Sequence, residues 1–207
     1  ASAGHHKAAA DNPAMHPQAL LDLCTELLRS VLKLDAPADG LVSAFFRRHR
    51  ALGPRERHTL AESAYSMLRH RLLYQHLARI GADPTDTRER DRRFAILAWQ
   101  GNQGFLRGAL APHEVQWLAK VQAIDPATLP DKLRHNLPDW IANPLREQLG
   151  EGFWPLVQAL NTPAPLDLRV NLLKAKRDAV QQQLQEAGIE AEPTPFSPWG
   201  LRLAGKP

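Results

Sequence analysis

The sequence predicts a mainly α-helical protein that ends in a small α+β module, and three observations support this fold class. Apolar residues recur at helical spacing from Leu20 to Leu160. The spacing then changes to strict alternation at Leu166, Leu168 and Val170, as in a half-buried strand. The composition, 43% hydrophobic and 23% charged, is ordinary for a globular protein. No apolar run approaches the ~20 residues of a membrane span.

The first half of the chain predicts three helices. Pro17 suits the first position of a helix, and Cys24 lies on its apolar face. Residues 41–50 form a short helix that turns basic at its end. Residues 54–80 are expected to form one long helix, again with a proline at its first position, and Gly81 suits its left-handed C-terminal cap.

Shorter helices are expected to follow. Asp91 can cap a helix, and residues 112–123 carry a second helical pattern. Pro144 cannot lie unperturbed inside a helix, so we expect a kink, or a restart capped by Asn143. Residues 151–160 predict a last short helix.

The C-terminal module combines strands with one helix. Residues 166–170 alternate as a strand, and residues 176–187 carry a narrow apolar stripe at helical spacing. Gly188 suits a left-handed C-terminal cap. Residues 189–193 predict a second strand, and residues 200–203 begin a third.

Positive charge is concentrated in one region of the chain. The net charge is +4, yet the segment from Leu41 to Arg93 alone carries twelve arginines against six acidic residues. Guanidinium groups match phosphate geometry and stack on bases, so this excess favours a nucleic-acid contact over a merely solvated surface. Charge alone does not distinguish RNA from DNA or from an acidic protein partner.

Two segments carry a resemblance to a known family. PLDLRVNLLK and KRDAVQQQLQEAGIEAEPTPFSPWGLRL resemble the module just upstream of the catalytic domain in Sun/Fmu-type RNA (cytosine-5) methyltransferases. GPRERHTLAESAYSMLRHRLLYQHLA resembles the main helix of a NusB-like RNA-binding domain. The family usually has Ser or Thr as the cap where this chain has Lys176.

The resemblance implies an organisation and a function. We expect a loose leader at residues 1–13, a NusB-like helical RNA-binding domain at residues 14–135, and the α+β module with a helical linker at residues 136–207. It implies a fragment that holds structured, ribosomal RNA as its partner, and the single cysteine makes a cytoplasmic location the default expectation. The S-adenosylmethionine-binding catalytic domain is expected to lie beyond this fragment. A stand-alone NusB-like factor and a non-catalytic protein-interaction bundle are the alternatives.

The candidate RNA-binding residues are basic or polar side chains on the helices and on the module. They are Arg47, Arg48, Arg50, Arg55, Arg57, Arg69, Arg71, Arg92, Arg93, Arg169, Asn171, Lys174, Lys176 and Arg177. We expect the arginines of the helical domain to share one open face. Lys174, Lys176 and Arg177 crowd the start of a helix, where free amides and basic side chains together favour a phosphate.

No catalytic, cofactor or metal site is expected within these residues. Cys24 lies among apolar neighbours rather than in a Pro-Cys or Thr-Cys dipeptide, so a structural role is favoured. A lone cysteine excludes an internal disulfide and suits a reducing compartment. Gly101, Gly104 and Gly108 lack the spacing of a cofactor loop and are expected to loosen the chain. The nine histidines show no metal-ligand spacing.

Overall fold

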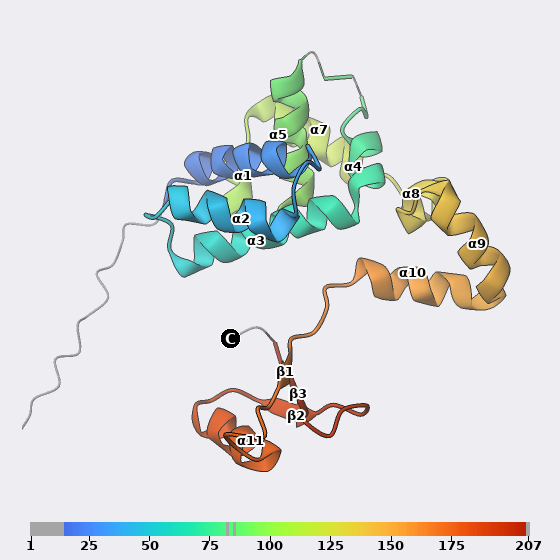
Figure 1. Cartoon of the computed structure of the whole chain (residues 1–207). Helices are drawn as coiled ribbons and strands as arrows, with labels where there is room; N and C mark the ends of the chain where they lie inside the picture. Colours follow the sequence, from blue (N-terminus) through green and yellow to red (C-terminus); the bar gives the residue numbers. More distant parts are fainter. Residues whose placement is uncertain (1–14, 82, 85, 206–207) are drawn as a thin grey trace, which may run out of the picture. The chain divides into compact units, whose positions relative to one another are not determined.

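The computed structural model describes residues 15–81, 83–84 and 86–205, and within them the chain forms two compact units (Figure 1). The first unit runs to Val157 and the second begins at Gln158. The predicted leader at residues 1–13 lies outside the described residues.

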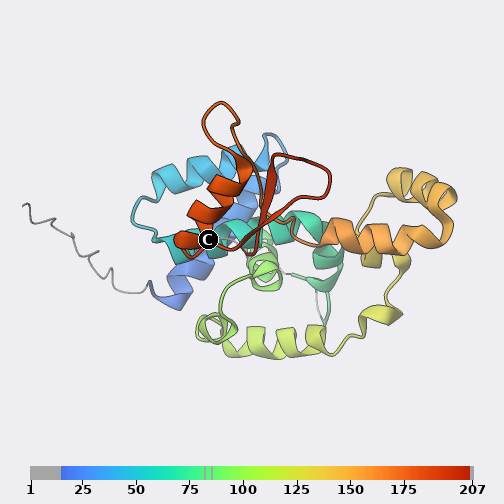
Figure 2. The same cartoon turned by 90° about the horizontal axis from the view of Figure 1, so that it is seen from below.

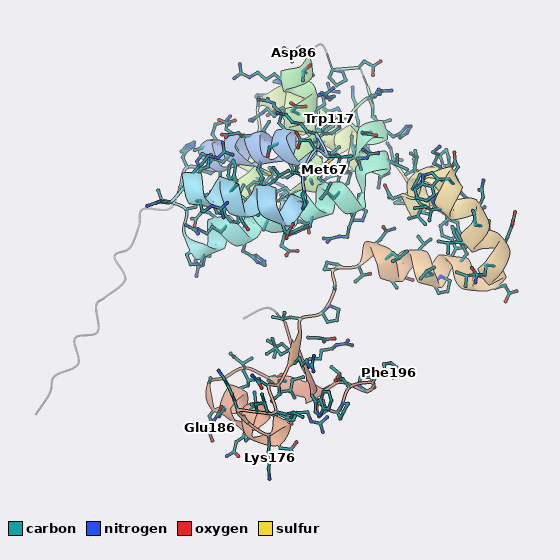
Figure 3. All side chains as sticks on the ribbon, viewed as in Figure 1. Met67, Asp86, Trp117, Lys176, Glu186 and Phe196 are labelled. Carbon is teal, nitrogen blue, oxygen red and sulfur yellow. The ribbon has the colours of Figure 1, made fainter. Side chains whose placement is uncertain are left out.

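Three helices form the centre of the first unit. α1 (Pro17–Val31), α3 (Pro54–Arg69) and α5 (Thr87–Ala98) pack against one another, and α2 (Ala38–Arg48) lies against α1 and α3 (Figure 1). α5 is seen end-on in Figure 2. Met67, labelled in Figure 3, is fully buried in this core, as are Cys24 and Phe45. Burying these apolar faces stabilises the fold by about 25 cal/mol per Å² removed from water.

Shorter helices follow in the first unit, and the last of them extends past Val157 into the second. They are α4 (Arg71–Leu77), α6 (Gln103–Arg107), α7 (Pro112–Gln122), the 3₁₀ turn η1 (Pro126–Thr128), α8 (Asp131–His135), α9 (Asp139–Leu149), the 3₁₀ turn η2 (Gly150–Gly152) and α10 (Phe153–Asn161). The backbone N–H of Leu73 in α4 donates to Asn136 Oδ1 at 3.0 Å, which ties α4 to the end of α8. A small second core forms around Ala142, Phe153 and Val157.

The expectation of one long helix over residues 54–80 is wrong. The helix breaks at His70, whose backbone angles of φ −114° and ψ 25° are not helical. Beyond the break, the Tyr74 hydroxyl lies 3.1 Å from the Ser66 hydroxyl. The hydrogen bond from α4 to Asn136 and the packing of α4 on α5 and α8 stabilise α4 as a separate helix. These contacts join residues far apart in the sequence, so local sequence patterns do not predict them.

Asp91 does not cap a helix. α5 begins four residues earlier, where Asp86 Oδ1 accepts a hydrogen bond from the Glu89 backbone N–H at 2.7 Å. Asp91 lies inside the helix and is 3% exposed, with Arg29 Nε donating to it at 2.8 Å. A carboxylate buried this deeply needs a cationic partner, and Arg29 on α1 supplies it.

Two further expectations about helix breaks are corrected in part. Of the kink or restart expected at Pro144, the restart does not occur, because α9 continues through Pro144 as one helix. The segment containing Gly101, Gly104 and Gly108 is not uniformly loose, because α6 forms inside it. There the Asn102 side chain accepts a hydrogen bond from the Phe105 backbone N–H at 2.9 Å and so caps the helix.

The second unit is a three-stranded antiparallel sheet with one helix. β1 (Asp167–Arg169) and β2 (Ala191–Pro193) both pair with β3 (Gly200–Leu203), giving the order β1-β3-β2. α11 (Arg177–Glu186) connects β1 to β2 and contacts β2 and β3. Leu201 and Leu203 are buried, and Arg202 between them is exposed, so the two faces of β3 differ in polarity.

The predicted fold class is confirmed. A helical bundle precedes a small strand-helix-strand module, and no parallel sheet occurs within the described residues. Gly188 has φ +76°, as predicted for the left-handed residue that ends α11.

Candidate nucleic-acid interface

Five predicted arginines gather where α2 ends and α3 begins, and we call this surface the α2–α3 corner. It consists of Arg47, Arg48, Arg50, Arg55 and Arg57. Local sequence explains the placement: the apolar positions of α2 face the core, and basic side chains in its last turn complement the helix dipole. Gly53 and Pro54 then start α3.

The α2–α3 corner contains a pocket of about 500 Å³ lined by Ser43, Phe46, Arg47, Arg50 and Arg57. Arg57 is held in place, because its Nε donates to the Leu52 carbonyl at 2.9 Å and its guanidinium lies 5.6 Å from the Phe46 ring centroid.

The other arginines at the corner remain available to a ligand. Arg47, Arg48, Arg50 and Arg55 are exposed and have no carboxylate partner among the residues that the structure describes. Fixed and free guanidinium groups side by side suit the binding of phosphates.

The arginines predicted at other places in the first unit do not share this surface. Arg69 ends α3, about 21 Å from Arg55 by the 1.5 Å rise per residue, and Arg71 begins α4 beyond the break. Arg69 Nε is buried and has no hydrogen-bond partner in the described part of the chain.

Arg92 and Arg93 are engaged by neighbouring side chains. Arg92 binds both carboxylate oxygens of Glu114 and also Asp22, and Arg93 binds Glu89 and covers the Trp117 ring. These two arginines therefore connect helices within the bundle. The expectation of one shared arginine face does not match this arrangement, since long-range partners decide which arginines remain free.

The predicted residues of the second unit lie around β1 and the start of α11. Arg169 is exposed, with its guanidinium 5.4 Å from the Trp199 ring centroid. Asn171 Oδ1 accepts from the Leu173 backbone N–H at 3.0 Å. Lys174 and Lys176 are exposed.

Lys176 is the N-cap residue of α11, as the resemblance implies. Its side chain makes no capping bond and extends away from the helix (Figure 3). The first amides of α11 therefore have no side-chain cap, and basic side chains surround them. Arg177 Nε lies 3.7 Å from Asp178 Oδ1, so this guanidinium is less available to a phosphate than the Lys176 ammonium group.

Sequence patterns missed a cavity of about 1070 Å³ in the first unit. Its walls carry both signs of charge: Arg29 from α1, Lys33 from the turn after α1, Arg71 from α4 and Arg90 from α5, together with Asp83, Asp86 and Asp91.

Cys24 is buried, as predicted, and its environment is unsuited to a nucleophile. Burial raises the pKa of the thiol from 9.0 to about 12, and a hydrogen bond with Ser63 lowers it only in part. A thiol that stays protonated at neutral pH is a poor nucleophile.

Two features that would hold a metal or a dinucleotide-like cofactor do not occur within the described residues. Among them no group of three or more His, Cys, Asp or Glu side chains converges to hold a metal ion. Gly101, Gly104 and Gly108 lie around α6 and do not follow a strand, so they do not form a cofactor loop.

Comparisons with known proteins agree with the architecture of the second unit. Residues 137–207 match the family described as "Methyltr_RsmF/B-like, ferredoxin-like domain". This match covers 71 of the 207 residues and includes the whole second unit. It confirms the predicted resemblance of the chain to the N-terminal region of Sun/Fmu-like methyltransferases.

The chain is also similar in sequence to curated proteins of this kind. The chain is 29% identical over 101 residues to Ribosomal RNA small subunit methyltransferase B of Photorhabdus laumondii, which covers 49% of this chain and 23% of that protein. It is 41% identical over 66 residues to the protein of the same name from Xylella fastidiosa strain Temecula1, covering 32% of this chain and 15% of that one. The chain thus spans less than a quarter of the length of these RsmB relatives.

A solved structure shares the fold. The crystal structure of PH0851 matches with a TM-score of 0.59 at 16% identity, over 93% of this chain and 49% of that one. Both units of this chain therefore have counterparts in one solved fold. Among the helices that the structure describes, none has the length and apolar character needed to cross a lipid bilayer.

Proposed function

We propose that this Sun/Fmu-like chain is the RNA-binding N-terminal portion of a ribosomal RNA (cytosine-5) methyltransferase. It holds structured RNA through phosphates, so that the catalytic domain of the full-length protein can transfer a methyl group from S-adenosylmethionine to a cytosine. The observation that supports this most strongly is the α2–α3 corner, where exposed arginines border a pocket without carboxylate partners among the described residues. The names of the relatives supply the substrate class.

The proposed division of labour follows the two parts of the chain. Residues 14–135 would form the NusB-like RNA-binding domain, and residues 136–207 the module that leads to the catalytic domain. The family match begins at residue 137, whereas the two compact units meet between Val157 and Gln158. The helices from residue 137 to Val157 accordingly serve as a linker with a small core of its own, and they contact α8 through the Arg146–Asp131 ion pair and the His135–Phe153 ring contact.

A salt titration of RNA binding tests this function. Each neutralised phosphate contributes about 0.7–0.9 to the slope of log K against log salt concentration. Replacing Arg47, Arg48 and Arg50 by alanine should therefore lower the magnitude of the slope by about 2 to 3 and weaken binding at low salt. Affinity for a ribosomal RNA stem-loop, followed by fluorescence anisotropy from 50 to 300 mM salt (roughly the range in which such contacts are screened), gives the measurement.

A matched variant separates local contacts from net charge. Arg88, Arg107 and Lys120 are exposed and lie on other helices, so their triple alanine variant removes the same charge elsewhere. It should change the slope by less than about 1. Equal losses in both triple variants would indicate a diffuse charge effect, and unchanged binding in the first would remove the α2–α3 corner from the RNA interface.

A further inference from the structure

A pocket of about 380 Å³ opens beside β1 in the second unit, lined by Arg169, Val170, Asn171, Leu172, Leu173 and Trp199. We propose that this pocket, called here the Trp199 pocket, binds one unpaired nucleotide of RNA with its base stacked against the indole. The inference rests on the RNA-binding function proposed above and adds the class of RNA that the second unit prefers. The volume lies at the lower end of the range for small-ligand sites, which suits a single nucleotide.

The first argument is the aromatic surface. The Arg169 guanidinium lies over the Trp199 ring at 5.4 Å from its centroid, yet the tryptophan remains 39% exposed. Arginine and tryptophan stacked in this way form a platform that is both flat and positively charged. Unpaired bases stack on such platforms with a gain of about 1–3 kcal/mol per base.

The second argument is that the pocket is already formed. The Val170 backbone N–H donates to the Trp199 carbonyl at 2.9 Å, which joins the segment after β1 to the segment before β3. Asn171 accepts from the Leu173 and Lys174 backbone N–H groups, through its side chain and its carbonyl respectively. A site held by backbone bonds loses little entropy on binding.

The third argument concerns the wall and its surroundings. Leu172 and Leu173 are 50% and 97% exposed, which leaves apolar surface in water unless a ligand covers it. An apolar wall alone would suit a protein partner. Here Lys174 and Lys176 follow directly, and the start of α11 lacks a side-chain cap, so phosphate-binding groups adjoin the wall. The combination favours a nucleotide over a protein.

Asn171 adds a means of reading the base. Its Oδ1 is used within the turn, whereas its Nδ2 donates to no atom within the described residues. An amide N–H₂ at the edge of a stacking platform can donate to an acceptor on the exposed edge of a base. Duplex RNA hides these edges and faces, so the pocket should discriminate against it.

The test compares unpaired and paired RNA with the full chain. A labelled single-stranded oligonucleotide and a duplex of the same length are titrated against wild type, Trp199→Ala and Trp199→Phe. Trp199→Ala should weaken binding of the single strand about 5- to 150-fold, which corresponds to the loss of one stacked base. Duplex binding should change less than about twofold, and Trp199→Phe should retain most of the single-strand affinity because it still stacks.

Controls separate this inference from the proposed function. Trp199 contributes its hydrogen bond through the backbone, and circular dichroism checks that the alanine variant is folded. If it is not, Arg169→Gln removes the cation from the platform at an exposed position and should weaken single-strand binding severalfold.

The outcomes are distinct. If wild type binds neither RNA, the proposed function fails. If the corner variant loses affinity while the Trp199 pocket variants bind single-stranded RNA like wild type, the function stands and this inference is overturned, which leaves the apolar wall to a protein partner. Equal losses for single strand and duplex would also overturn it.

Discussion

Asp91 illustrates how a buried carboxylate binds arginines that would otherwise be available to a ligand. It is 3% exposed and accepts hydrogen bonds from Arg29 at 2.8 Å and from Arg90 at 2.9 Å. Arg92 and Arg93, next along α5, bind Glu114 and Glu89. Three of the four arginines on α5 therefore pair with carboxylates, whereas the arginines of the α2–α3 corner do not have such partners among the described residues.

Replacement of Asp91 by asparagine tests this structural role. Two charge-assisted hydrogen bonds lose their acceptor charge, so the free energy of unfolding should fall by about 1–3 kcal/mol. Urea denaturation followed by circular dichroism measures it. Asp83→Asn is the matched control, because its pair with Arg79 is exposed and spans 3.8 Å; it should cost less than about 1 kcal/mol. Equal costs at the two positions would contradict the structural role of Asp91.

Cys24 predicts a pH dependence of stability. Burial raises the pKa of the thiol from 9.0 to about 12 in the folded state, so the thiolate is favoured only in the unfolded chain. The stability that Cys24 contributes is complete below pH 9 and is lost as pH rises from 9 towards 12. Relative to the Cys24→Ala variant, the free energy of unfolding of wild type should fall by up to about 1.4 kcal/mol per pH unit in this window.

The measurement is a set of urea titrations of both proteins from pH 8 to 10.5, with the difference between them plotted against pH. A difference that stays constant over this range would contradict the buried thiol. In addition, the native protein should resist thiol reagents at pH 8 and react once it is unfolded.

At the scale of elements, α11 shows a conflict between helix stability and the proposed binding of phosphate. Its N-cap is Lys176, which makes no capping bond, and only Asp178 in the first turn complements the helix dipole. Ser, Thr, Asp or Asn at an N-cap accepts a hydrogen bond from the first amides of the helix. A lysine in this place leaves the helix less stable than one of these capping residues would, and it keeps a cation beside the first amides.

Lys176→Ser should therefore act in opposite directions on stability and on RNA binding. A serine cap should raise the stability of the second unit by about 0.5–2 kcal/mol. Loss of the cation should reduce the salt slope of RNA binding by about 0.7–0.9. Thermal unfolding and the anisotropy titration measure the two effects.

Lys176→Gln is the control, since it removes the charge without adding a good cap. It should lower the slope equally and leave stability within about 0.5 kcal/mol of wild type. If the serine variant gains stability without any change in slope, Lys176 does not contact phosphate.

At the scale of the whole molecule, the chain consists of two compact units with separate cores. The core of the first unit includes Leu60 on α3, and that of the second includes Leu201 on β3, and both side chains are fully buried. A three-stranded sheet with one helix is a small structure, so its core residues should be sensitive to truncation.

Hydrogen exchange of two alanine variants tests whether the units open separately. Leu201→Ala should destabilise the second unit by about 2–5 kcal/mol and accelerate exchange in β1, β3 and α11, while α1, α3 and α5 keep their protection. Leu60→Ala should do the reverse. Loss of protection throughout the chain in either variant would mean that the two units unfold as one.

Much of the fold follows from local patterns. Prolines at positions 17, 54 and 112 each occupy the first position of a helix, because a ring without an N–H is tolerated there. The change to alternation near Leu168 locates β1, and Gly188 takes the left-handed conformation that ends α11. The basic excess between Leu41 and Arg93 is likewise a property of the sequence alone.

Only the tertiary structure decides which of these charged and aromatic groups are available to a ligand. Arg29 reaches Asp91 across 62 residues, Arg92 reaches Asp22 across 70, and Trp199 meets Arg169 across the sheet. A local window encodes backbone conformation and the side of an element that is buried. The neutralisation of a charge by a distant partner depends on how the elements pack, and this decides where a polyanion can bind.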